Sequence, residues 1–186
     1  MAYTAFDRFV SWCRYRAAVP YIKPGAHVCD VGCGLDAGFL RYACARVRFG
    51  VGLDDQIVTS GNNQVPLVRT DITAGLPLRS EQFDYVVMLA VLEHLREPEP
   101  VLRETFRLLI PGGSLILTWP QGAIDPLLHI LHGIGLISDE MESQEHQKRI
   151  PLDTLVHILE QIGFRQFMHR RFEFGLNNLL VASRPR

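Results

Sequence analysis

Three aspartates of this sequence each stand at the end of a short apolar run. Asp30 lies near the end of the run 27–31, Asp54 follows 49–53, and Asp71 follows 65–69. If these runs are neighbouring parallel strands, their carboxyl ends meet at one edge of a sheet and the three acids line one crevice. Ionised carboxylates accept hydrogen bonds, so such a crevice suits hydroxyls, amino groups or a cationic ligand.

A glycine-rich turn follows the first of these runs, with glycines at Gly32, Gly34 and Gly38. Such a turn lets the backbone approach a nucleotide-like ligand closely. The spacing misses the dinucleotide pattern G-x-G-x-x-G by one position. Asp30 would also repel a pyrophosphate, whereas it would suit an ammonium or sulfonium group. The turn therefore favours a ligand with an ammonium or sulfonium group over a nicotinamide cofactor, and a nicotinamide oxidoreductase is the lesser alternative.

The other two aspartates are candidates for nucleoside recognition. Asp54 follows Asp30 by 54 − 30 = 24 residues, which is a usual strand–helix–strand interval. At the end of its strand it is placed to accept hydrogen bonds from both hydroxyls of a ribose. Asp71 and Ile72 could receive the amino group and the face of a purine. A single aspartate after a strand can instead form a turn. For Asp71 both interpretations stay open, and for Asp55 the turn is favoured.

Strand-length apolar runs alternate with segments of helical period, which is typical of a doubly wound α/β fold with a mostly parallel sheet. The segment 54–64 is too short for a full crossover helix, so we expect a clipped helix or a loop there. The last two strands are expected at an antiparallel edge. Helices are predicted at 5–19, 39–45, 99–109 and 152–162, and seven strands at 27–31, 49–53, 65–69, 84–89, 114–119, 164–169 and 178–182.

Length and composition favour one domain over residues 1–186, with an N-terminal helix in 1–24 and an insertion at 120–148. The 19 basic and 20 acidic residues leave a net charge of −1, which argues against a nucleic-acid partner. No apolar run approaches a membrane span and no secretory leader is expected, so we predict a cytoplasmic protein. The four cysteines form no zinc-binding pattern, and no metal site is predicted.

The chain resembles the class I S-adenosylmethionine-dependent methyltransferases, specifically the small-molecule group called type 11. The resemblance rests on VCDVGCG at 28–34, VGLDD at 51–55 and the stretch 75–120, which contains Leu92-Glu93-His94 and Leu109-Ile110-Pro111-Gly112-Gly113. It implies a Rossmann-like sheet of seven strands, the last antiparallel, and S-adenosyl-L-methionine as cofactor.

Carried over by position, the resemblance also implies residue roles. The methionine part of the cofactor would be held by Asp30, Gly32 and Gly34, the ribose by Asp54, and the adenine by Asp71 and Ile72. Backbone around Leu89 and Ala90 would lie near the sulfonium. The sequence departs from the family at Asp36, where the third glycine of the loop is usual.

Methyl transfer needs alignment and exclusion of water more than many catalytic side chains. A hydroxyl or carbon acceptor also needs a base, for which His94 is the best-placed candidate. The alternative for His94 is a packing role in the turn. Leu89-Ala90-Val91-Leu92 replaces the Asn/Asp-Pro-Pro-aromatic motif of enzymes that methylate nucleic-acid amino groups, so a small-molecule or lipid-like acceptor is predicted.

The apolar segment 125–137 is compatible with a lid over an apolar acceptor, a packed helix or the interface of a homodimer. The rival to an enzyme is a protein that binds the cofactor without catalysis, as a sensor or as a subunit that activates a partner.

Overall fold

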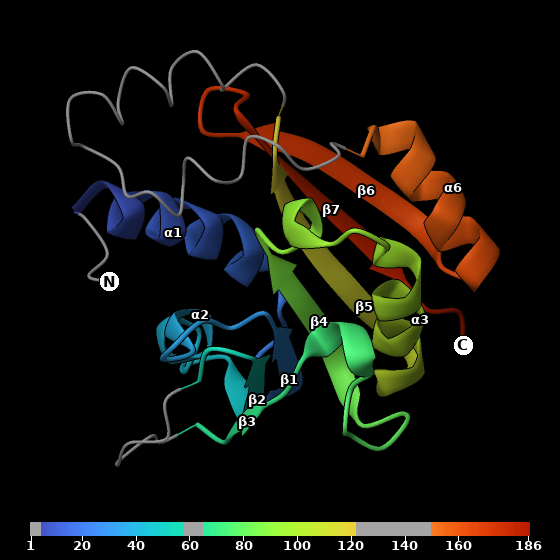
Figure 1. Cartoon of the computed structure of the whole chain (residues 1–186), viewed down its shortest axis with the longest axis horizontal. Coiled ribbons are helices and arrows are strands. Elements are labelled where there is room, and N and C mark those ends of the chain that lie inside the picture. Colours follow the sequence, from blue (N-terminus) through green and yellow to red (C-terminus); the bar gives the residue numbers. More distant parts are fainter. Residues whose placement is uncertain (1–4, 58–64, 122–149) are drawn as a thin grey trace.

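The computed structural model describes residues 5–57, 65–121 and 150–186, and a single sheet runs through them (Figure 1). Its strand order is β3-β2-β1-β4-β5-β7-β6. The pairs from β3 to β5 are parallel, and β7 is antiparallel to both β5 and β6. This confirms the predicted seven-stranded α/β fold. The strands are β1 (Ala26–Val31), β2 (Val47–Asp54), β3 (Leu67–Arg69), β4 (Phe83–Leu89), β5 (Leu109–Pro120), β6 (Arg165–Phe172) and β7 (Asn177–Ser183).

Helices cover both faces of the sheet, with α1 and α2 on one side and α3 and α6 on the other (Figure 1). Successive strand residues feed the two cores alternately, since Val28 packs in the α1–α2 core and Cys29 in the α3–α6 core. The helices are α1 (Ala5–Ala18), α2 (Gly38–Tyr42), α3 (Pro98–Leu108) and α6 (Leu152–Ile162), with 3₁₀ turns η1 (Val19–Tyr21), η2 (Ile72–Ala74) and η3 (Leu92–His94).

The strand order reverses at β1, which pairs with β2 on one side and with β4 on the other. Ligands of open α/β sheets bind outside the carboxyl ends of the strands at such a switch point. The glycine-rich turn follows β1 at this position, so the predicted site lies where the topology favours ligand binding.

Most element boundaries differ from the predicted ones by one to three residues, and the differences at β5 and α2 have clear structural causes. Strand β5 begins at Leu109, directly after α3, rather than at Ser114. Pro111-Gly112-Gly113 therefore lies within the strand, where Gly112 has φ +84° and the β4–β5 register shifts. The Gly112 N–H donates to the Arg184 carbonyl at 3.0 Å, so the chain end pairs with this irregular segment. Helix α2 is shorter than predicted, because the chain turns after Tyr42.

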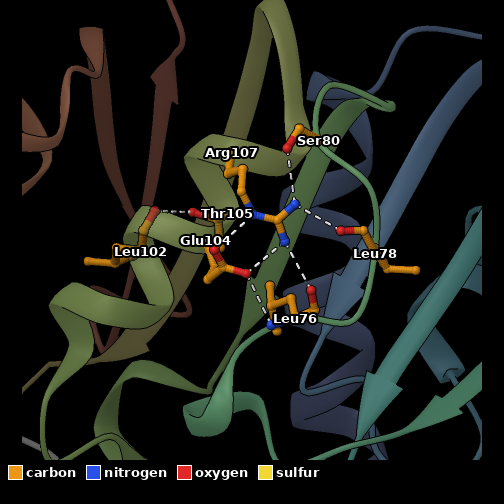
Figure 2. A network of polar contacts seen from close by, with 7 residues as sticks. All are labelled: Leu76, Leu78, Ser80, Leu102, Glu104, Thr105 and Arg107. Carbon is orange, nitrogen blue, oxygen red and sulfur yellow. Dashed lines mark hydrogen bonds and ion pairs between the residues drawn. The ribbon is translucent and has the colours of Figure 1, made fainter.

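One arginine ties α3 to the segment that follows η2 (Figure 2). Arg107 donates to the carbonyls of Leu76 and Leu78 at 2.9 and 2.8 Å and pairs with Glu104 at 2.7 Å. Glu104 in turn accepts from the Leu76 N–H at 3.1 Å. These bonds satisfy backbone groups of a segment that has no regular structure, and they hold that segment against α3.

Several expectations lie outside the described residues: most of the connection 54–64, the insertion 120–148 and the apolar segment 125–137. Within the described residues, no helix is long and apolar enough to cross a membrane.

Candidate functional site

A cavity of about 1040 Å³ lies at the carboxyl ends of the parallel strands. Its walls come from the glycine-rich turn, the ends of β2 and β4, the turn η2 and one side of α1. The structure brings most of the predicted site residues to this cavity: Gly32, Gly34, Asp54, Asp71, Ile72, Leu89, Ala90 and His94. It does not bring Asp30 to the cavity wall.

The glycine-rich turn has a backbone shape that side chains would disturb. Gly32 and Gly34 have φ of +75° and +71°, in the left-handed region that favours glycine. A Cβ atom on Gly32 would lie 2.4 Å from Cγ2 of Val91, which follows β4. The turn after β1 therefore packs directly on the turn after β4, and both contribute to the cavity.

Asp54 links the end of β2 to the glycine-rich turn. Its Oδ2 accepts a hydrogen bond from the Gly34 N–H at 2.8 Å, and its Oδ1 accepts one from the Gln56 N–H at 2.9 Å. Each carboxylate oxygen has two lone pairs, so further acceptor capacity remains for ligand hydroxyls. The carboxylate is thus oriented before any ligand binds.

Asp30 lies behind the turn, only 2% exposed, with its Oδ2 buried and without a hydrogen-bond partner among the described residues. Burial, with a smaller contribution from the charge of Asp54, raises the pKa of Asp30 to about 8. The side chain is therefore largely protonated at neutral pH. A direct contact between Asp30 and a ligand needs a rearrangement, and the contact implied by the resemblance stays a prediction.

Asp71 forms the turn that the sequence favours as one alternative, while its contact with an adenine stays a prediction. Its Oδ1 accepts hydrogen bonds from the Thr73 N–H at 2.8 Å and the Thr73 hydroxyl at 2.6 Å, which caps η2. These bonds lower the pKa of Asp71. The residue also lines the cavity beside Ile72. The cap fixes the turn that carries these two residues.

The turn after β4 supplies the opposite wall. Ala90 has φ +58°, and its N–H donates to the Thr118 carbonyl of β5 at 2.9 Å. His94 ends η3 and lines the cavity. Burial, together with the nearby charge of Arg14, lowers the pKa of His94, so its imidazole is neutral at pH 7. A neutral imidazole can accept a proton.

The departure at Asp36 has a local explanation. Asp36 forms an ion pair with Arg41 of α2, and both residues line the cavity. The pair neutralises the extra acid of the loop, although both side chains are more than half exposed and the ion pair adds little stability.

Helix α1 contributes site residues that sequence reasoning did not single out. Four of them share one helical face by their i, i+3, i+4, i+7 spacing, which was the signal available, and Arg14 lies beside that face: Arg8, Ser11, Trp12, Tyr15 and Arg14. The helix covers the cavity with two aromatic rings and two cationic groups. Glu93, the middle residue of the motif Leu92-Glu93-His94, was not predicted to be a site residue. It is a buried acid beside this wall, and burial raises its pKa to about 7.

Comparison with known proteins agrees with this geometry. Residues 29–117 match the family described as a methyltransferase domain, type 11. The chain is 25% identical to a demethylmenaquinone methyltransferase of Bacillus cereus, over 97% of this chain and 87% of the relative.

Solved structures show the same fold. An S-adenosylmethionine-dependent methyltransferase of Archaeoglobus fulgidus superposes with a TM-score of 0.74 at 18% identity, covering 95% of this chain and 94% of that one. Phosphoethanolamine N-methyltransferase 2 of Haemonchus contortus, in complex with S-adenosyl-L-methionine, superposes with a TM-score of 0.70 at 16% identity. The match covers 94% of this chain and 53% of that one.

The domain match falls on the strands and turns that build the cavity. Residues 29–117 of the chain are similar to the type 11 methyltransferase domain, and the fold is that of the S-adenosylmethionine-dependent methyltransferases.

Proposed function

We propose that this protein transfers the methyl group of S-adenosyl-L-methionine to a hydrophobic small-molecule acceptor. The observation that carries the proposal is a single cavity with two kinds of lining. The glycine-rich turn, Asp54 and Asp71 line one part of it, and the aromatic residues of α1 line the other. The first part suits a nucleoside and the second suits an apolar ring. When bound, the cofactor supplies an electrophilic methyl group on a sulfonium.

The residues of the chain fit this cofactor. The left-handed turn at Gly32 and Gly34 admits a ligand close to the backbone, and Asp54 has acceptor capacity for the ribose hydroxyls. Asp71 and Ile72 would receive the adenine, and the backbone at Leu89 and Ala90 would border the reacting end.

Three aromatic rings lie on the acceptor side of the cavity. Trp12 and Tyr15 come from α1, and Tyr42 lies at the end of α2, where its ring centroid is 5.7 Å from that of Tyr15. These rings offer apolar contact area with few rotatable bonds. The curated relative, a demethylmenaquinone methyltransferase, makes a ring compound of the quinone class the first acceptor to test.

His94 would take the proton that the acceptor loses. The acceptor atom attacks the methyl carbon in line with the sulfur, the electron pair of the carbon–sulfur bond stays on sulfur, and S-adenosylhomocysteine leaves. Most of the rate gain would come from holding the two partners in line in a site that excludes water.

The test is an assay with radiolabelled cofactor and three acceptors: a prenylated 1,4-naphthoquinol without its ring methyl group, 2-naphthol and 1-naphthylamine. They present a carbon, an oxygen and a nitrogen nucleophile. We expect one labelled product, formed in equal amount to S-adenosylhomocysteine. Cofactor binding by calorimetry without a product from any of the three, or from a metabolite extract, would instead indicate a binding protein or an activating subunit.

A further inference from the structure

A group of charged side chains at the α1 wall of the cavity has no role in cofactor binding as described above. It consists of Arg14 of α1, Glu93 of η3 and Glu173, which lies between β6 and β7. The charge of Arg14 acts on both acids and on His94. Residues from three distant parts of the chain therefore meet beside the turn that follows β4.

Several polar atoms of this group are buried and have no hydrogen-bond partner among the described residues. They are Nε of Arg14 and both carboxylate oxygens of Glu93. Buried polar groups normally have partners, because an unmade hydrogen bond leaves the loss of water uncompensated. Of the three side chains, Arg14 lines the cavity. The guanidinium of Arg14 therefore has donor capacity left for a ligand that enters there.

We propose that Arg14 is the acceptor-recognition residue: its guanidinium binds an oxyanion of the acceptor, such as a phenolate, an enolate or a carboxylate. Glu93 and Glu173 lie close enough to Arg14 for its charge to act on both carboxyl groups. This inference rests on the methyl transfer proposed above.

The chemistry of the group favours an oxygen anion. A guanidinium has five N–H donors in a planar fork and no acceptor, so its natural partner is a pair of oxygen lone pairs. Burial raises the pKa of Glu93 to about 7 and also raises the pKa of Glu173. Either acid can take up a proton when a negative charge arrives, so the cluster tolerates an anion next to Arg14.

Glu173 is held in place by the turn that carries it. Its Oε2 accepts a hydrogen bond from the Asn177 amide at the start of β7, and the backbone from Glu173 to Gly175 is left-handed. The turn that carries Glu173 is therefore a fixed support rather than a free loop.

The test uses two probes with the same ring, 2-naphthoate and 2-(hydroxymethyl)naphthalene, titrated by calorimetry into protein saturated with S-adenosylhomocysteine. We expect the wild type to bind 2-naphthoate at least 10-fold more tightly than the neutral probe. Arg14→Ala should reduce that ratio to within twofold, and Arg14→Lys should keep part of it. Glu93→Gln removes a carboxyl group near the guanidinium, so it should bind 2-naphthoate at least as tightly as the wild type and leave binding of the neutral probe unchanged.

The matched control is Arg16→Ala, on the same helix. Arg16 packs over the Trp12 ring, 4.7 Å from its centroid, and does not line the cavity. This variant should keep the preference for 2-naphthoate. Thermal unfolding of every variant identifies misfolded protein, and Arg14→Gln, which keeps much of the side-chain volume, replaces Arg14→Ala if that variant does not fold.

Equal binding of the two probes by the wild type, or a preference that survives in the Arg14 variants, would overturn the inference. So would an Arg14→Ala variant that loses S-adenosylhomocysteine affinity as much as probe affinity, because Arg14 would then be a cofactor ligand. Failure of the proposed methyl transfer looks different: the Arg14-dependent preference remains while no acceptor is methylated.

Discussion

Oδ2 of Asp54 lies 2.8 Å from the backbone nitrogen of Gly34 and accepts its hydrogen bond. The acid proposed to bind the ribose and the turn proposed to bind the methionine part of the cofactor are thus one bonded unit. β2 carries the first and β1 the second, and these strands are neighbours in the sheet. A change at either residue should therefore affect both halves of the cofactor site.

Asp54→Ala should weaken binding of S-adenosylhomocysteine about 10- to 100-fold, the loss expected when one or two hydrogen bonds to a charged group disappear. Isothermal calorimetry measures this directly. Asp153→Ala is the control, since Asp153 lies at an exposed position in the first turn of α6 and does not line the cavity. Unchanged affinity in Asp54→Ala would refute the ribose role.

Gly32→Ala should lower the free energy of unfolding by about 2–4 kcal/mol, because a left-handed φ and a Cβ placed 2.4 Å from Val91 Cγ2 combine. Gly25→Ala is the control: φ there is +81° and nothing lies within 4 Å of the added Cβ, so only the conformational cost of about 1 kcal/mol applies. Urea unfolding of both variants gives the comparison. Equal losses would show that the contact with Val91 yields easily.

Asp30→Asn should change the pH dependence of stability. The pKa of Asp30 in the folded protein, about 8, lies above its ordinary 3.8, so the contribution of Asp30 to stability is complete below pH 3.8 and is lost as the pH rises toward 8. The asparagine does not titrate. The free energy of unfolding of Asp30→Asn, relative to that of the wild type, should therefore rise by up to about 1.4 kcal/mol for each pH unit between pH 5 and 7.

Denaturant unfolding at pH 5, 6 and 7 tests this expectation. Asp36→Asn serves as the control, because it removes an exposed carboxylate from the same loop. A stability difference between Asp30→Asn and wild type that does not vary with pH would show that Asp30 is ionised in the folded protein.

His94→Gln should reduce kcat at pH 7.5 about 100-fold or more if the imidazole takes the proton of the acceptor. Because burial lowers the pKa of His94, the wild-type rate should stay constant as the pH falls to about 6.5 and decline below it. The variant should lack this decline. His157→Gln, at an exposed position of α6, is the control. Full activity in His94→Gln would leave His94 with the packing role.

The local pattern of the sequence determined most of the fold. Alternating apolar runs placed all seven strands, and Gly163, with φ +121°, ends α6 where predicted. The strand-end aspartates and the glycines were predictable for the same reason, because a parallel sheet brings the ends of its strands to one edge. β5 was the exception: Pro111-Gly112-Gly113 has the composition of a turn, but tertiary pairing with β4 and Arg184 holds it in the strand.

Only the tertiary structure decided which of these residues face the cavity. Asp30 and Asp54 look alike in the sequence, yet packing buries the first behind the turn and orients the second through Gly34. Likewise, nothing local relates Arg14 to Glu93 or Glu173, since contacts between distant segments depend on how α1 and the β6–β7 turn pack beside β4. Strand ends follow from local periodicity, whereas the protonation and partners of buried charges follow from long-range packing.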